Sequence, residues 1–157
     1  MRSPRLPRPT QAQIQLADKL GLNVRGLSQG VAIAKILELV EAALHGRVDN
    51  RMATDKQIAF GKQLGLDLDG ETLTIASVRI GEVLEAQNLR AIRRMRLKPG
   101  DKVRRADPFT LSDGREMYDA REFVVSSIYP DGSVYFKGGN GQRAWARNLE
   151  KIGSAST

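Results

Sequence analysis

The chain has 157 residues, and hydrophobic residues make up 41% of them, a share that favours a packed core over wholesale disorder. Lysine and arginine number 25 against 18 aspartates and glutamates, so the formal charge is +7, and a basic balance favours polyanionic partners. The absence of cysteine excludes disulfides, thiolate zinc sites and cysteine nucleophiles.

The first nine residues are predicted to form an extended, mobile arm, because prolines at positions 4, 7 and 9 block helix and strand. They lack the apolar stretch of a secretory signal, and no apolar run in the chain reaches the roughly 18 residues that a membrane helix needs. We therefore expect a cytoplasmic protein with no membrane partner. Basic arms lie along a phosphate backbone or enter a minor groove, although many termini simply fray. The candidate contacts in the arm are Arg2, Arg5 and Arg8.

An internal repeat follows the arm. Residues 10–42 align with residues 54–86 without a gap, at an offset of 44 positions. The matches include Thr10 with Thr54, Leu20-Gly21-Leu22 with Leu64-Gly65-Leu66, and Glu41-Ala42 with Glu85-Ala86. The alignment predicts two copies of one helical unit, over residues 10–46 and 54–96.

Each copy is predicted to form a helix, an extended link and a second helix. Thr10 and Thr54 are residues of the N-cap type, whose side-chain oxygen accepts an orphan backbone N–H. Gly21 tolerates the left-handed conformation that ends a helix, and its counterpart in the second copy does the same. Ser28 and Thr72 are expected to cap the second helices. A unit this short buries its apolar face poorly, so we expect the copies to pack together or to exchange between chains.

This plan resembles the SAP-like helix-extended-helix modules, many of which bind DNA and some of which bind proteins. The resemblance covers residues 9–45 and 53–90 and rests on the pattern TxxQI…LGL…S/T…A…I. It implies that basic residues around the link and the start of the second helix face DNA. Those residues are Arg25, Lys35, Lys56, Lys62 and Arg79.

The second copy departs from this pattern at its link, where Asp67, Asp69 and Glu71 form an acidic stretch. Carboxylates at that position repel phosphate. The second copy is therefore predicted to be structural or to face a basic protein partner.

A cluster of arginines lies in the last helix of the second copy, which is predicted to continue through EAQNLRAIRRMRL. Three of these arginines share one side of a helix, while Leu89, Ile92 and Met95 can face the core. Arginine forks match phosphate oxygens, so we interpret this side as a phosphate contact, with a solvated charged face as the alternative. Pro99-Gly100 is predicted to end the helix. The candidate contacts are Arg90, Arg93, Arg94, Arg96 and Lys98.

Residues 97–152 change in character, because helical periodicity stops and short β-like runs separated by turn signals begin. Pro130-Asp131-Gly132 and the run GGNG are the two clearest turns. Strands are predicted at about 101–106, within 115–129, at 133–137 and at 142–146, with a closing segment at 147–152. Five short strands in this length suit a small β-barrel.

This segment resembles SH3-like barrels, including the KOW and Tudor-like groups, on the strength of LKPGDKV, V..I..DG.V.F and NLEKI. The resemblance covers about a third of the chain. It implies a barrel of a kind that binds RNA, DNA, methylated side chains or proline-rich peptides. The predicted fold class is thus α+β, two tandem helix-extended-helix repeats and a five-stranded SH3-like barrel, with a flexible tail at 153–157.

Seven of the eight aromatic residues lie in this segment, six of them from Tyr118 onward, and most are expected in the core. Trp145 lies between Arg143 and Arg147 in a strand-like pattern, so the three side chains are predicted to share one face. If that face is outward, it is a candidate site for bases or phosphate. If Trp145 faces inward, the two arginines must reach solvent at the rim.

The sequence offers no catalytic, metal or cofactor site. His45 is the single histidine and has no triad or metal partner nearby in the sequence, and neither a Walker motif nor GxGxxG is present. We therefore expect a non-enzymatic nucleic-acid-binding protein without a small-molecule substrate, accessory or regulatory in role, from a mobile element or a larger nucleoprotein assembly. DNA is slightly favoured over RNA, backbone contacts dominate and sequence selectivity is weak. The alternative is a protein–protein adaptor within a larger nucleoprotein machine.

Overall fold

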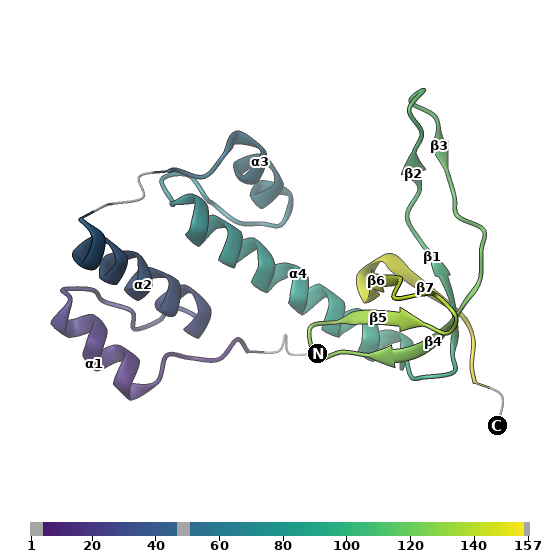
Figure 1. Cartoon of the computed structure of the whole chain (residues 1–157), viewed down its shortest axis with the longest axis horizontal. Coiled ribbons are helices and arrows are strands. Elements are labelled where there is room, and N and C mark those ends of the chain that lie inside the picture. Colours follow the sequence, from purple (N-terminus) through teal and green to yellow (C-terminus); the bar gives the residue numbers. More distant parts are fainter. Residues whose placement is uncertain (1–4, 47–50, 156–157) are drawn as a thin grey trace. The chain divides into compact units, whose positions relative to one another are not determined.

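A computed structural model describes residues 5–46 and 51–155 of the chain, with helices preceding an antiparallel sheet (Figure 1). This arrangement confirms the predicted α+β class. The chain divides into two compact units, Met1–Leu84 and Glu85–Thr157. The division falls inside one long helix, whereas our predicted boundary at residue 97 follows the change in secondary structure. Within the described ranges, no helix is long and apolar enough to cross a membrane.

Four α-helices lie in the described part of the chain, and their bounds recur along it. They are α1 Gln11–Lys19, α2 Gln29–His45, α3 Asp55–Gln63 and α4 Leu73–Met95. α3 begins and ends 44 positions after α1, and α4 begins 44 positions after α2. α4 then continues beyond the length of α2 into the second unit.

The helix starts have the same local chemistry in both copies. Thr10 Oγ1 accepts from Gln13 N at 3.2 Å, and Gln13 Oε1 accepts from Thr10 N at 2.8 Å. Thr54 and Gln57 form the same capping box. Two otherwise unpaired backbone donors are thus satisfied at the start of each first helix.

In the core of the first unit, the two copies differ in the sizes of two side chains that touch, and the two differences compensate each other. Ala17 and Val24 are buried against each other in the first copy, and their counterparts are Gly61 and Leu68. A Cβ on Gly61 would lie 2.5 Å from Leu68 Cδ1, so the larger leucine occupies the volume that the glycine leaves. A further cluster of Val31, Ala34 and Ile75 joins α2 to the first part of α4.

The second unit contains a five-stranded antiparallel sheet in the order β6-β5-β4-β1-β7. Its strands are β1 Lys102–Arg105, β4 Phe123–Ile128, β5 Ser133–Phe136, β6 Arg143–Trp145 and β7 Leu149–Gly153. A hairpin of β2 Phe109–Thr110 and β3 Glu116–Met117 is inserted between β1 and β4. The sheet is not closed, because β6 and β7 lie at opposite edges and a 3-10 helix, Ala146–Asn148, separates them in the chain.

The last turns of α4 pack against the sheet and supply part of its core. Ala91 on α4 and Leu97, two residues after the helix ends, are buried with Val103, Val125 and Val134. α4 ends at Met95, four residues before the stop predicted at Pro99, because Arg96 adopts a left-handed φ of 47°. Leu97 N then donates to Ile92 O, so the chain turns back toward the core.

The predicted tail is attached to the second unit as far as Ala155. Gly153 belongs to β7, and Ala155 N donates to the buried carboxylate of Asp101 at 2.9 Å. Lys98 N and Lys151 Nζ bond to the other oxygen of that carboxylate, at 2.9 and 3.2 Å. Burial alone would raise the pKa of Asp101, but these donors outweigh it, and the net direction is downward.

Candidate nucleic-acid interface

Two of the predicted phosphate contacts in the first unit, Arg25 and Arg79, are paired with acidic groups. Arg25 donates from Nη1 and Nη2 to the two carboxylate oxygens of Asp18, at 2.8 and 2.7 Å. This bond raises the pKa of Arg25 and lowers that of Asp18. Arg79 Nη1 donates to Asp67 O at 2.9 Å and lies 3.3 Å from Glu71 Oε1. The acidic link of the second copy therefore engages the arginine that the resemblance assigned to DNA.

The remaining candidates of the first unit differ in position. Lys35 is half-buried on α2. Arg5 and Arg8 are exposed before α1, whereas Arg2 lies outside the described residues.

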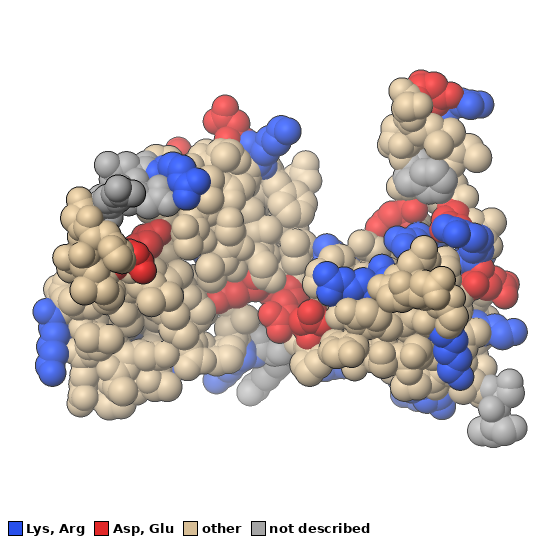
Figure 2. Space-filling model, in the orientation of Figure 1, with Lys and Arg blue, Asp and Glu red and all other residues tan. Residues whose placement is uncertain are grey.

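The second unit carries the larger positive charge. Residues 85–157 contain 14 of the 25 basic residues and 9 of the 18 acidic ones, a formal charge of +5. Lys and Arg side chains are visible at several points around its sheet, with acidic side chains near the start of the β2–β3 hairpin (Figure 2). The arginine-bearing part of α4 belongs to this unit.

Some basic residues of this unit are paired with a carboxylate and others are not. Arg104 pairs with Glu150 at 3.0 Å, and Arg115 and Arg121 pair with neighbouring aspartates at 2.7 and 2.8 Å. By contrast, six predicted contacts have no carboxylate oxygen within 4.0 Å among residues 5–46 and 51–155. These are Arg93, Arg94, Arg96, Lys98, Arg143 and Arg147, and we call them the unpaired cations. Arg90 is exposed on the same helix.

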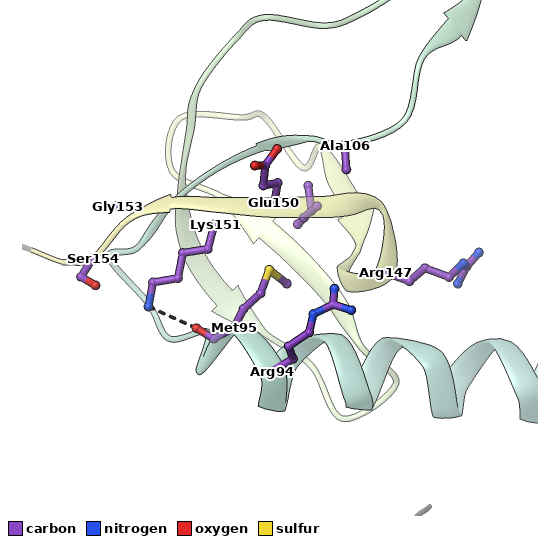
Figure 3. A pocket seen from close by; sticks show the side chains of 9 residues that line it. Arg94, Met95, Ala106, Arg147, Glu150, Lys151, Gly153 and Ser154 are labelled. Atoms are coloured by element: carbon purple, nitrogen blue, oxygen red, sulfur yellow. Dashed lines mark hydrogen bonds between the residues drawn. The ribbon is translucent and has the colours of Figure 1, made fainter. Parts of the chain in front are cut away.

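Two unpaired cations line one open depression between α4 and β7, with a volume of about 590 Å³. In Figure 3, Arg94 extends from α4 and Arg147 from the segment before β7. Lys151, also in the lining, donates to Met95 O at 3.3 Å. The lining carboxylate, Glu150, is the partner of Arg104, so the depression keeps an excess of positive charge.

The face of β5 and β6 that turns away from the core combines aromatic rings with guanidinium groups. Ala144 and Ala146 are buried, so the alternation of the strand places Trp145 on the outer face, where it is half-buried. The guanidinium carbons of Arg143 and Arg147 lie 5.7 and 5.6 Å from the Trp145 ring centroid. These distances are in the range of cation–π contacts.

Two tyrosines extend this surface. Tyr135 on β5 is the register partner of Arg143, and Arg143 Nη1 contacts Tyr135 Oη at 3.5 Å. The ring of Tyr129 lies 4.9 Å from that of Tyr135, and 51% of Tyr129 is exposed. We call this set the aromatic strip; it consists of Tyr129, Tyr135, Arg143, Trp145 and Arg147.

Arg147 is held by a neutral side chain. Its backbone N and its Nη1 both donate to Asn88 Oδ1, at 3.2 and 3.1 Å. Asn88 is 1% exposed, and a Cβ on Gly132 would lie only 2.2 Å from its Cβ, so a glycine is required opposite it. Burial lowers the pKa of Arg147, but its ordinary value is so high that the guanidinium stays charged.

Sequence reasoning placed Arg143, Trp145 and Arg147 on one face and Arg93 and Arg94 on one helix side, and the structure brings both groups into the second unit. The sequence analysis did not identify Asn88, because an asparagine in a helix is usually solvent-exposed. The available signal was its spacing of three and four residues from Ala91 and Ile92, which places a polar residue on the buried side.

No known protein family, curated protein or solved structure matches the chain. Within the described residues, no group of three or more histidine, cysteine, aspartate or glutamate side chains is placed to hold a metal ion. The geometry of the second unit is therefore the basis for assigning a role.

Proposed function

We propose that this chain is a nucleic-acid-binding accessory or regulatory protein that holds the sugar–phosphate backbone with weak sequence selectivity. The observation that carries this proposal is the group of six unpaired cations on the second unit, two of which line one open depression. DNA is slightly favoured over RNA, because the helical copies of the first unit resemble SAP-like modules.

Unpaired cations suit this role for an electrostatic reason. A cation already paired with a carboxylate must give up that contact before it meets phosphate, and its net effect on affinity is small. An unpaired lysine or arginine releases counterions from the nucleic acid without that exchange. The paired Arg25 and Arg79 are consequently assigned to the folding of the first unit.

We also propose that the second unit is an SH3-like barrel of the KOW or Tudor type. The strand order β6-β5-β4-β1-β7 and a 3-10 turn before the last strand support this assignment. The matching bounds of the helices support two tandem SAP-like repeats in the first unit.

A salt titration tests the proposed function. Affinity is measured for a random-sequence duplex and for a single strand of equal length at several salt concentrations, by fluorescence anisotropy. Binding to at least one of them, weakening steeply with salt, is expected. The variant R93A/R94A/R96A should bind more weakly and with a flatter salt slope. Absence of binding to both nucleic acids at low salt would contradict the proposal.

The alternative function is a protein–protein adaptor, and one observation favours it. An apolar groove on the first unit is lined by Ile33, Leu37, Leu39 and Met52, all of them exposed. An adaptor that uses this surface would bind neither nucleic acid at moderate salt. The same titration therefore distinguishes the two functions.

A further inference from the structure

We propose that the aromatic strip is a stacking platform that selects unpaired bases, so that the protein prefers single-stranded nucleic acid to duplex. This inference rests on the proposed function and specifies the substrate class. It goes beyond backbone contact, because a base offers its ring face only when it is not stacked inside a duplex.

The register of β5 and β6 aligns the rings. Tyr135 pairs with Arg143, and Ser133 pairs with Trp145 on the same face of the sheet. The intervening pair, Val134 and Ala144, points into the core. Alternation thus presents aromatic and cationic side chains outward from two neighbouring strands, and the buried residue opposite Trp145 is a small serine rather than another bulky group.

Exposure provides room for a base. Half of Tyr129 is exposed, and its ring is tilted at 56° against that of Tyr135 rather than covered by it. A base that stacks on Tyr129 therefore does not have to displace a core side chain. Stacking on an aromatic ring tolerates any base, which agrees with weak sequence selectivity.

Arg143 and Arg147 have different roles on this platform. Arg147 donates to Asn88 Oδ1 from its backbone N and from Nη1, so its guanidinium is held in place beside the Trp145 ring. Arg143 is exposed and is held by the long contact to Tyr135 Oη and by the Trp145 ring. A base that approaches Trp145 displaces this guanidinium, which then meets the phosphate of the same strand.

The charges of Asp107 and Asp131 act on Arg147 and Arg143 of the strip, and neither carboxylate forms an ion pair with them within 4.0 Å. Asp131 Oδ1 accepts from Ser133 N at 2.9 Å and from Ser133 Oγ at 2.7 Å. Its carboxylate is thereby used to hold the turn between β4 and β5. The bonds from Ser133 lower the pKa of Asp131, and the charge of Arg143 lowers it further.

Trp145 is the single tryptophan of the chain, so the intrinsic tryptophan fluorescence comes from the aromatic strip. The full chain is titrated with three probes of about 15 units, a length that one small barrel can cover. The probes are oligo-dT, an abasic strand with the same number of phosphates, and a random-sequence duplex. Trp145 fluorescence and anisotropy of labelled probes are recorded at one low salt concentration.

The expected result has two parts. Oligo-dT quenches Trp145 and binds about 10-fold or more tightly than the abasic strand, since each stacked base contributes roughly a factor of 5 to 150. Tyr129→Ala lowers the affinity for oligo-dT by a similar factor and leaves the affinities for the abasic strand and the duplex unchanged. Tyr118→Ala serves as the matched control, because Tyr118 is 67% exposed but lies after the β2–β3 hairpin, off the strip.

Two outcomes would overturn the platform, and they differ in their meaning for the proposed function. Equal affinity for oligo-dT and the abasic strand, without quenching, removes the platform and leaves backbone binding intact. Absence of binding to all three probes removes both. Tyr129→Leu provides a second variant that retains apolar volume, and it should lose base preference as Tyr129→Ala does.

Discussion

The hydroxyl of Ser28 donates a hydrogen bond of 2.6 Å to Glu82 Oε1, joining the cap of α2 to the middle of α4. The repeat-related residues form the reciprocal bond, from Thr72 Oγ1 at the cap of α4 to Glu38 Oε1 on α2, also at 2.6 Å. The start of each helix therefore lies beside a later turn of the other, in an antiparallel arrangement. The two sequence copies meet through one self-complementary contact used twice.

This relationship predicts equal coupling energies in two double-mutant cycles, S28A with E82A and T72A with E38A. A hydrogen bond to a charged group contributes about 1.5–3 kcal/mol, and each hydroxyl also caps its own helix. We expect a coupling of about 1.5 kcal/mol in both cycles, measured by urea unfolding. Glu41→Ala, an exposed position on α2, is the control and should change the free energy of unfolding by less than about 0.5 kcal/mol. Coupling in one cycle alone would contradict the reciprocal arrangement.

Gly132→Ala is predicted to destabilise the second unit strongly. Gly132 has a φ of 87°, and an added Cβ would lie 2.2 Å from Asn88 Cβ. Gly114→Ala is the matched control, because Gly114 has a φ of 85° and nothing within 4 Å of such a Cβ. Backbone strain alone costs about 1–2 kcal/mol, and overpacking adds about 1–3 kcal/mol. In thermal unfolding, the Tm of Gly132→Ala should lie clearly below that of Gly114→Ala. An equal decrease in Tm for the two variants would show that the contact with Asn88 does not determine the loss of stability.

Arg96→Gly is predicted to increase stability and to weaken nucleic-acid binding. Arg96 has a φ of 47° at the end of α4, a conformation that costs a non-glycine residue about 1 kcal/mol. Glycine removes this strain together with one unpaired cation. Arg96→Ala removes the cation but keeps the strain, so it should weaken binding to the same extent with no gain in the free energy of unfolding. If both variants bound like the parent chain, Arg96 would not contact the nucleic acid.

Stability is predicted to fall between about pH 4 and pH 2 because of Asp119. Its pKa is lowered from 3.8 to about 2, first by the hydrogen bond from the Arg121 side chain and then by that residue's backbone N–H and the nearby charges. The unfolded chain takes up the proton near pH 3.8, before the native chain does, so the free energy of unfolding decreases as the pH drops through this window.

Asp119→Asn tests this assignment, since it removes the titrating group. Urea unfolding from pH 5 to pH 2 should show a shallower decline in the variant than in the parent chain. Arg105 also lies 3.7 Å from Asp119, so Arg121→Ala alone is expected to remove most, and not all, of the difference. Identical slopes for the parent chain and Asp119→Asn would disprove the role of this carboxylate.

Local signals made much of the architecture predictable. Cap residues such as Thr10 and Thr54 and the ungapped alignment indicated where the helices begin, because capping acts over three residues. The strands at 133–136 and 143–145 were predicted to within one residue, since turns with glycine bound them. Sequence order does not reveal whether a sheet closes; the five strands form an open sheet, and the predicted SH3-like barrel stays a prediction.

The candidate site was less predictable than the fold, because ion pairing depends on distant residues. Nothing in the residue pattern separates Arg25 from Arg94, yet Asp18 binds Arg25, and no carboxylate binds Arg94 among the described residues. Likewise, the link of the second copy was expected to repel phosphate, and in the structure its Glu71 engages Arg79. Such distinctions require three-dimensional neighbours.

The most direct test of the central claim compares two triple variants with the same loss of charge. R93A/R94A/R147A removes three unpaired cations, whereas R25A/R104A/R115A removes three arginines that are paired with carboxylates. The slope of log affinity against log salt for a single strand should flatten by about 2 in the first variant and stay near the parent value in the second. Equal slopes in the two variants would show that net charge alone governs binding and would contradict the proposed interface.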